Sequence, residues 1–193
     1  PSPSFEIHAA GIGEIPGPML TELPESLGQL TQLLSLDLSE NQLTTLPDWL
    51  GQLTRLRELN LSGNQLTVLP ESLGNLINLN SLYLYSNQIK TFPESLENLI
   101  NLKILNLARN NLKVIPVIVR KLKTLNSLIL SGNNIADIPS WLVNLHQLNS
   151  LSLGDDVKGG NPLFFLPNDL DKLKNLHELE VRSCALTDLP TSL

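Results

Sequence analysis

The segment LNLSGNQLTVLP, residues 59–70, decides the fold of this chain. Leu59 and Leu61 alternate with polar residues, which is the period of a short strand with one buried face. Asn64 follows within an apolar stretch, where a bare amide needs hydrogen-bonding partners. Its side chain has two donors and an acceptor, so it can satisfy backbone groups where the chain leaves the strand. Pro70 then fixes φ and removes a donor, so the strand cannot continue.

This segment recurs along the chain with a strict period. Asn64 and Asn87 are 23 residues apart (87 − 64), and the leucines around each keep the same step. The repeating unit is LxxLxLxxNxLxxLPxxLxxLxx. A fixed period of this length is typical of a solenoid, in which successive coils share one core. We expect the ladder position of each coil to be buried, and it is filled by Asn41, Asn64, Asn87, Asn110, Asn133, Asn161 and Cys184.

The second half of each unit predicts the return limb of the coil. Leucines three residues apart after each proline indicate short helical or 3-10 turns. Parallel strands lie about 4.7–4.9 Å apart, whereas packed helical elements need about 8–10 Å, so the stack must bend with its strands inside. We therefore expect an α/β fold, a curved right-handed solenoid with a parallel sheet on the concave face and short turns on the convex face.

The period also predicts the domain organisation. Residues 20–193 are expected to form one repeat domain of about eight units, with a truncated last unit. Residues 1–19 contain an echo of the pattern at residues 12–16, and we expect an atypical or truncated N-terminal coil there.

The period is interrupted by an insertion near residues 154–160, with the sequence GDDVKGG. A calcium site there would need about six to eight oxygen ligands, more than this segment supplies. The segment is either a solvated loop or a loop that contacts a partner, because insertions in repeat arrays map to one face. Cys184 is expected to be a structural residue rather than a reactive thiol, since the pattern places no basic side chain beside it.

Composition excludes several classes of function. The net charge of −6 and the pI near 5.0 argue against nucleic acid as a partner. No apolar run reaches the roughly 18 residues of a spanning helix, so we expect no membrane insertion. A single cysteine favours an intracellular, reducing compartment over secretion. Phosphate-loop, zinc-protease, paired-cysteine and nucleophile-elbow motifs are missing, so neither an enzyme nor a metal or cofactor is expected.

Candidate binding residues lie at strand positions that face away from the core. Tyr83 and Tyr85 are the only tyrosines of the chain and share one strand segment, and Arg109 follows one unit later. Tyrosine and arginine often anchor protein interfaces. The alternative is that they are ordinary exposed strand residues, since tyrosine has a high strand propensity. The expected concave contacts to a protein or peptide are Asp37, Asn60, Tyr83, Tyr85, Ile104, Asn106, Arg109, Ile129 and Arg182.

A second candidate surface is apolar and lies on the convex side. Val117, Ile118 and Trp141 occupy positions after the proline that carry acidic residues or serine in most other units. They either pack against neighbouring coils or form a contact for self-association or for another domain. We accordingly expect a monomer or a weakly self-associating protein.

The segments LPESLGQLTQLLSLDLSENQLTTLP, residues 23–47, and LPESLGNLINLNSLYLYSNQIKTFP, residues 69–93, resemble the LPxxLxxL class of leucine-rich repeats. Scribble-like scaffolds, plant intracellular Ras-group proteins and bacterial Roco-type GTPases carry such repeats. The resemblance implies a solenoid that binds proteins through its concave face. It leaves three functions open: an interaction module, the sensing or regulatory arm of a larger GTPase, kinase or effector ubiquitin ligase with catalysis outside this segment, or extracellular recognition.

Overall fold

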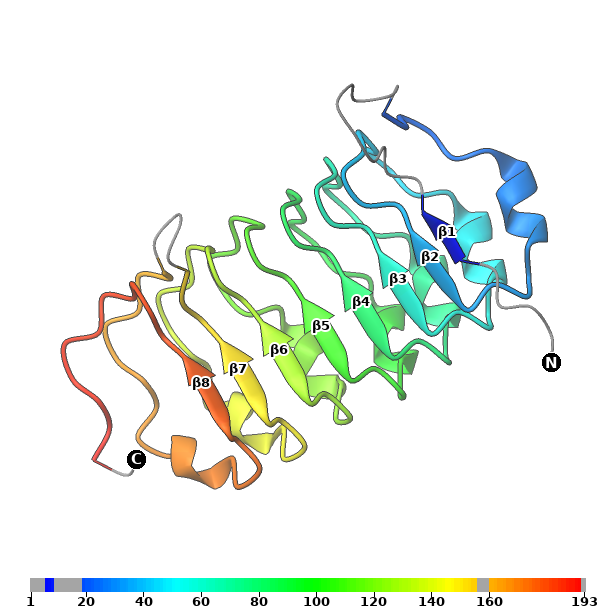
Figure 1. Cartoon of the computed structure of the whole chain (residues 1–193). Helices are drawn as coiled ribbons and strands as arrows, with labels where there is room; N and C mark the ends of the chain where they lie inside the picture. The colour runs from blue at the N-terminus through cyan, green and yellow to red at the C-terminus, as the bar shows by residue number, and fades with distance from the viewer. Residues whose placement is uncertain (1–5, 9–18, 156–159, 192–193) are drawn as a thin grey trace.

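The chain folds into a stack of coils joined by one parallel sheet. The computed structural model describes residues 6–8, 19–155 and 160–191 (Figure 1). Eight strands of these residues pair in chain order, each parallel to the next. The predicted parallel sheet is confirmed. The strands are β1 Glu6–His8, β2 Ser35–Asp37, β3 Glu58–Asn60, β4 Ser81–Tyr83, β5 Ile104–Asn106, β6 Ser127–Ile129, β7 Ser150–Ser152 and β8 Glu178–Glu180.

The register of the sheet follows the sequence period. The central leucine of each strand from β2 onward pairs with the central leucine of the next, as Leu59 does with Leu82. Between β7 and β8 the paired residues Ser150 and Glu178 are 28 positions apart. The extra five residues (28 − 23) belong to the insertion, which leaves the sheet unbroken. Residues 156–159 of the insertion lie outside the described residues.

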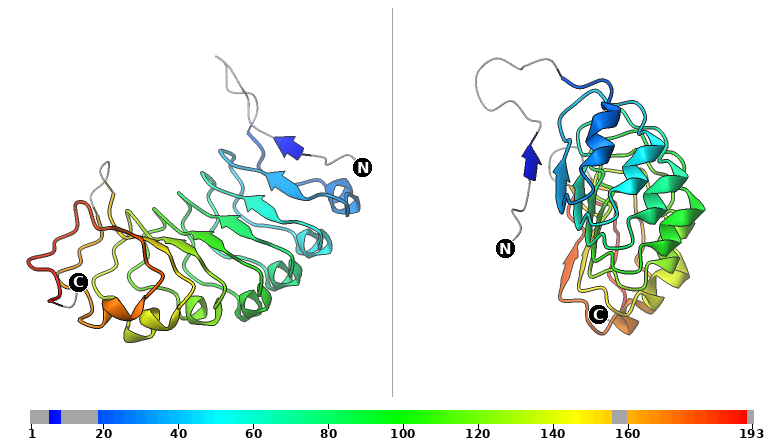
Figure 2. Two further views of the ribbon diagram at one scale, coloured as in Figure 1. Left: turned by 60° about the horizontal axis from the view of Figure 1, so that its bottom comes forward. Right: turned by 90° about the vertical axis from the view of Figure 1, so that its right-hand side faces the viewer.

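Short 3-10 helices form the opposite side of the stack. Each of the first six begins directly after a proline whose φ suits the turn, such as Pro70 with φ of −72° before η3. Figure 2 shows the strands along the inner side of the arc and the helical turns along the outer side. This confirms the predicted convex layer. The helices are η1 Glu25–Gln29, η2 Asp48–Gln52, η3 Glu71–Asn75, η4 Glu94–Asn98, η5 Val117–Lys121, η6 Ser140–Asn144 and η7 Leu170–Lys172.

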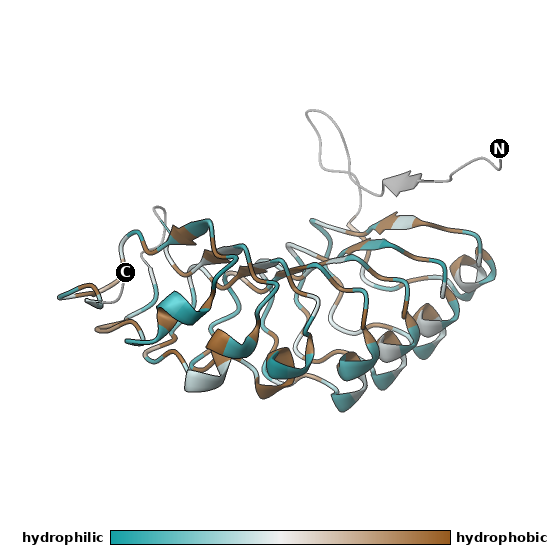
Figure 3. Cartoon of the chain, turned by 90° about the horizontal axis from the view of Figure 1, so that it is seen from below, coloured by the Kyte–Doolittle hydropathy of each residue, from teal (hydrophilic) through white to brown (hydrophobic). Residues whose placement is uncertain are grey.

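Leucine fills the space between the two layers. In the unit of the opening segment, Leu59, Leu61, Leu66, Leu73 and Leu76 are all fully buried. Figure 3 shows hydrophobic segments recurring at the same place in successive coils. Because no coil buries its leucines alone, each depends on its neighbours for its hydrophobic stabilisation.

A column of buried asparagines closes the core where the strands end. Asn87 donates from Nδ2 to the carbonyl oxygens of Leu61 at 2.9 Å and Leu84 at 3.2 Å. Its Oδ1 accepts from the backbone N–H of Leu66 at 3.0 Å. One amide therefore satisfies backbone groups of its own coil and of the preceding coil. Equivalent bonds are made by Asn41, Asn64, Asn110, Asn133 and Asn161.

Cys184 occupies the last position of this column and bonds more weakly. Its Sγ lies 3.5 Å from the carbonyl oxygen of Leu153, the group that Asn161 also contacts at 2.7 Å. Burial is the main cause that raises the pKa of the Cys184 thiol, so the thiolate is disfavoured. These contacts favour a structural role over a reactive thiol.

A row of glycines allows neighbouring helical turns to approach one another closely. A Cβ added at Gly51 would lie 2.4 Å from the backbone oxygen of Ser72, and one added at Gly74 would lie 2.3 Å from that of Ser95. Both distances are far below van der Waals contact, so only glycine fits between η2, η3 and η4.

The N-terminal segment contributes a strand that the sequence did not predict. Glu6–His8 pairs with Ser35–Asp37 and extends the sheet beyond the first complete unit. The echo of the pattern at residues 12–16 lies outside the described residues.

Candidate protein-binding surface

The centre of the concave face combines aromatic and aliphatic side chains. Sheet register places Tyr83 of β4, Asn106 of β5 and Ile129 of β6 in one row across the strands. Ile104 lies in the neighbouring row, two residues before Asn106. All four residues are partly exposed, whereas the leucines between them are buried. We call Tyr83, Tyr85, Ile104 and Ile129 the central patch.

Three of the polar residues predicted to meet a partner also stabilise their own coil. Side-chain Oδ1 atoms of Asp37, Asn60 and Asn106 accept the backbone N–H two residues further on, at 2.9, 3.1 and 3.0 Å. This is the Asx turn, which fixes the chain as it leaves the strand. The sequence could have indicated these turns, because each of the three residues is an Asp or Asn at the last position of its strand. We predicted partner contact for all three residues and did not predict this turn.

Tyr85 and Arg109 form a contact between adjacent coils. The guanidinium carbon of Arg109 lies 5.3 Å from the centre of the Tyr85 ring. That distance suits a cation–π interaction, which holds both side chains against the rim of the sheet. Tyr85 is therefore presented in an ordered position rather than as a free side chain.

Arg109 also reaches two coils forward to the insertion. Its Nε and Nη2 donate to the two carboxylate oxygens of Asp155 at 2.7 and 3.0 Å. The side chains are only 18% and 9% exposed. The hydrogen bond to Asp155 raises the pKa of Arg109 further above its usual value. The charge of Arg109, one of the expected partner contacts, is therefore engaged within the chain.

Gly132 leaves the space that this ion pair needs. It lies in the intervening coil with φ of +63°, and an added Cβ would come within 2.8 Å of Arg109 Cγ and 3.0 Å of Asp155 Oδ2. We call Arg109, Gly132 and Asp155 the rim clasp. It ties the first residues of the insertion to the edge of the central patch.

Replacing Arg109 with leucine is expected to lower the free energy of unfolding by about 1–3 kcal/mol, because the charge-assisted bonds to a nearly buried carboxylate are lost. Urea unfolding at neutral pH measures the loss. Arg57→Leu is the matched control, since Arg57 is exposed, and it should change stability by less than about 0.5 kcal/mol. Equal losses in both variants would contradict the assigned role of the clasp.

The C-terminal end of the concave face carries a chain of hydrogen bonds. The hydroxyls of Ser131 and Ser152 lie 2.8 Å apart, and Ser152 donates to Glu180 Oε2 at 2.6 Å. Arg182, another predicted contact, donates from Nε to Glu180 Oε1 at 2.9 Å. The bond from Ser152, followed by that from Arg182, lowers the pKa of Glu180. This end is polar and internally bonded, unlike the central patch.

The expected convex patch is reduced to one exposed residue. Val117 is 59% exposed, whereas Ile118 and Trp141 are partly buried against the core. For these two side chains the structure supports packing between coils. A different apolar surface, which we did not predict, is formed by Phe164 and Phe165, which are 54% and 69% exposed. The sequence could have indicated this surface, because two adjacent aromatic residues are unusual in a chain with few aromatics.

Two kinds of feature are missing from the described residues. None of their helices is long and apolar enough to cross a membrane. Within the same part of the chain, no three histidine, cysteine, aspartate or glutamate side chains gather as a metal ion would require.

Comparison with protein families matches the repeat pattern over nearly the whole described solenoid. The family described as leucine-rich repeat region matches residues 88–192, more than half of the chain. The chain belongs to the leucine-rich repeat family. Two related families, leucine rich repeat and leucine rich repeats in two copies, match residues 20–66 and 54–98. Leucine-rich repeat domains are generally protein-interaction modules.

Solved structures of leucine-rich repeat proteins share the fold. An internalin, inlF, from Listeria monocytogenes is 32% identical with a TM-score of 0.72, over 86% of this chain and 46% of that chain. The ectodomain of the receptor kinase GASSHO1/SCHENGEN3 from Arabidopsis thaliana, in complex with CASPARIAN STRIP INTEGRITY FACTOR 2, is 35% identical with a TM-score of 0.70, over 87% and 23%.

A third similar structure is the Arabidopsis receptor kinase HAESA in complex with the peptide hormone IDA and the co-receptor SERK1. It is 32% identical with a TM-score of 0.70, over 87% of this chain and 28% of that chain. This leucine-rich repeat chain thus spans less than half the length of each of these three proteins. Comparison with curated protein sequences gives no match.

Proposed function

We propose that this leucine-rich repeat chain is a non-catalytic interaction module that binds a polypeptide on its concave face. The observation that carries the proposal is the central patch, in which both tyrosines and two isoleucines of neighbouring strands are partly exposed side by side. Aromatic side chains bury a large area at a low entropic cost, and they dominate the energy of many interfaces.

Two further features support this proposal. The cation–π contact with Arg109 fixes Tyr85 before a partner arrives, which lowers the entropic cost of binding. The similar structures of GASSHO1/SCHENGEN3 and HAESA are complexes with a named integrity factor and with a peptide hormone. A polypeptide ligand is therefore the class of partner that we assign to this chain.

Joint replacement of Tyr83 and Tyr85 with alanine is expected to weaken partner binding by about 2 kcal/mol, or roughly 30-fold. Partners are first captured with the wild-type chain and identified by mass spectrometry. Each is then titrated against the wild type and the double variant by calorimetry.

The paired change Phe164→Ala and Phe165→Ala is the matched control for this test. It removes an exposed aromatic pair that lies away from the strands, so affinity should stay within about twofold of the wild type. An unchanged affinity in the tyrosine variant, or equal losses in both variants, would contradict binding at the central patch.

A second proposal is that this module is the sensing or regulatory arm of a larger signalling enzyme. It is favoured by the receptor kinases among the similar structures, of which the chain spans about a quarter. Sequencing the gene on both sides of this segment tests it, because a kinase or GTPase domain should follow or precede the repeats. The intracellular compartment favoured by the single cysteine stays a prediction.

A further inference from the structure

The row of glycines in the convex layer ends at η4. Glu97 occupies the repeat position of Gly74, and Ile118 of η5 occupies the position of Ser95, the residue that contacts Gly74. A bulky pair thus replaces the small pair that lets η3 and η4 touch, so η5 cannot approach η4 as closely. A groove of about 540 Å³ lies between η4 and η5.

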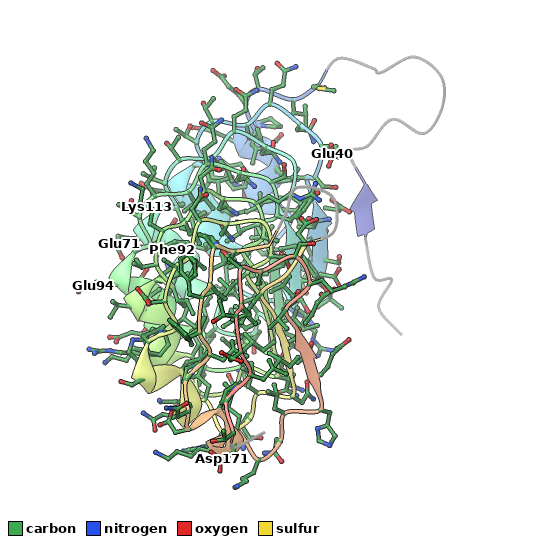
Figure 4. All side chains as sticks on the ribbon, turned by 90° about the vertical axis from the view of Figure 1, so that its left-hand side faces the viewer. Glu40, Glu71, Phe92, Glu94, Lys113 and Asp171 are labelled. Atoms are coloured by element: carbon green, nitrogen blue, oxygen red, sulfur yellow. The ribbon has the colours of Figure 1, made fainter. Side chains whose placement is uncertain are left out.

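This groove continues onto the flank of the solenoid. A second hollow of about 440 Å³ shares Lys90, Phe92 and Pro116 with the first, and Val114 lines its outer part. Figure 4 shows Phe92, Glu94 and Lys113 on the side of the coils away from the strands. We call the two hollows together the convex groove. It is separate from the central patch of the concave face.

The convex groove offers apolar surface to a ligand. Phe92 is partly buried against the core and lines both hollows. At the edges, Val114 is 67% exposed and Val117 is 59% exposed. Contiguous exposed apolar surface of this kind favours the docking of bulky apolar side chains.

The charge around the convex groove is opposite to that of the whole chain. The net charge is −6, yet the charged residues that line the two hollows are four basic ones, Lys90, Lys113, Arg120 and Lys121, and two acidic ones, Glu94 and Glu97. Lys121 pairs with Glu97 at 3.3 Å. Among the described residues, no carboxylate forms an ion pair with Lys90, Lys113 or Arg120.

From this charge complementarity we propose that the convex groove binds an acidic polypeptide segment that carries bulky apolar side chains. The apolar side chains enter between η4 and η5, while the carboxylates of the segment face Lys90, Lys113 and Arg120. Basic residues at the rim set the specificity and the association rate, and the apolar contacts retain the segment. The proposal does not depend on binding at the concave face.

The test uses a short fluorescent peptide in which phenylalanine and leucine lie between aspartates and glutamates. We expect it to bind the wild-type chain in fluorescence anisotropy at concentrations below about 1 mM, and the double variant Lys90→Glu with Arg120→Glu to weaken binding about tenfold or more. The charge-matched control is Lys103→Glu with Lys123→Glu. These exposed lysines lie in the coil that carries Arg120 but do not line the groove, so affinity should change much less.

A second measurement needs no variant of the protein. In methyl NMR spectra of the wild-type chain, the peptide should shift the signals of Val117 and Ile118 more than those of Ile104 and Ile129 on the concave face. A peptide with lysine in place of the acidic residues, and one with serine in place of phenylalanine and leucine, should both bind at least about tenfold more weakly.

Three results would overturn the proposal. They are the absence of peptide binding up to about 1 mM, equal weakening by both pairs of charge reversals, and peptide-induced shifts confined to the concave methyl groups. Self-association of the wild type that Lys90→Glu with Arg120→Glu abolishes, seen by sedimentation velocity, would assign the groove to a second copy of the chain and also overturn it.

Discussion

Asn87→Ala is expected to lower the free energy of unfolding by about 4 kcal/mol. The substitution leaves the buried N–H of Leu66 without its partner. It also removes one donor from each of the carbonyls of Leu61 and Leu84, which keep hydrogen bonds from Asn64 and Asn110. A buried unsatisfied group costs about 1–3 kcal/mol, and each of the two other hydrogen bonds lost costs about 0.5–1.5 kcal/mol. Asn87 is only 5% exposed, so water cannot readily replace these bonds. Urea unfolding followed by circular dichroism measures the effect.

Two further variants separate the hydrogen bonds from other effects. Asn75→Ala removes an exposed asparagine of η3, and should change stability by less than about 0.5 kcal/mol. Asn87→Asp preserves the shape and the acceptor but replaces the donor with a carboxylate facing two carbonyl oxygens. It should destabilise the chain at least as much as alanine does at neutral pH. A loss below about 1 kcal/mol in both Asn87 variants would refute the role of the amide column.

Gly74→Ala is expected to cost about 3 kcal/mol, although alanine is intrinsically the better helix former. The new Cβ would lie 2.3 Å from the backbone oxygen of Ser95 and 2.5 Å from its Cβ. Since both atoms belong to a packed neighbouring coil, η3 and η4 must separate to admit it. Chemical unfolding and the melting temperature report the loss.

Gly28→Ala is the matched control for this prediction. There the three atoms nearest to the added Cβ belong to the ring of Trp49, at 3.1–3.3 Å, and this partly exposed side chain needs to move by only a few tenths of an ångström. The cost should stay below about 1 kcal/mol. If Gly28→Ala proved as harmful as Gly74→Ala, close packing of the helical turns would not explain the glycine row.

The repeat made much of the fold predictable. The leucine pattern around Asn64 recurs around Asn87. Its period specifies the length of a coil and the parallel direction of the strands, and its alternation specifies the buried faces. The short turns followed from the prolines for the same reason. Strand β1 was not predictable, because Glu6–His8 pairs with β2 without carrying the repeat pattern.

The candidate site was predictable only where it depends on strand alternation. That rule places Tyr83 and Ile129 on the open face of the sheet. It carries no information about the rim clasp, whose members Arg109 and Asp155 are 46 residues apart and meet because Gly132 leaves room between them. Strand alternation likewise does not predict the convex groove. The groove depends on how η4 and η5 pack where Glu97 occupies the repeat position that is glycine in the preceding units.

The most direct test of the account is oxidative footprinting of Tyr83 and Tyr85 with and without a captured partner. They are the only tyrosines of the chain, so their modification is measured without ambiguity. We expect partner binding to slow the oxidation of both tyrosines several-fold and to leave Phe164 and Phe165 unchanged. Unaltered oxidation of the tyrosines in a saturated complex, with protection elsewhere on the coils, would contradict binding at the concave face.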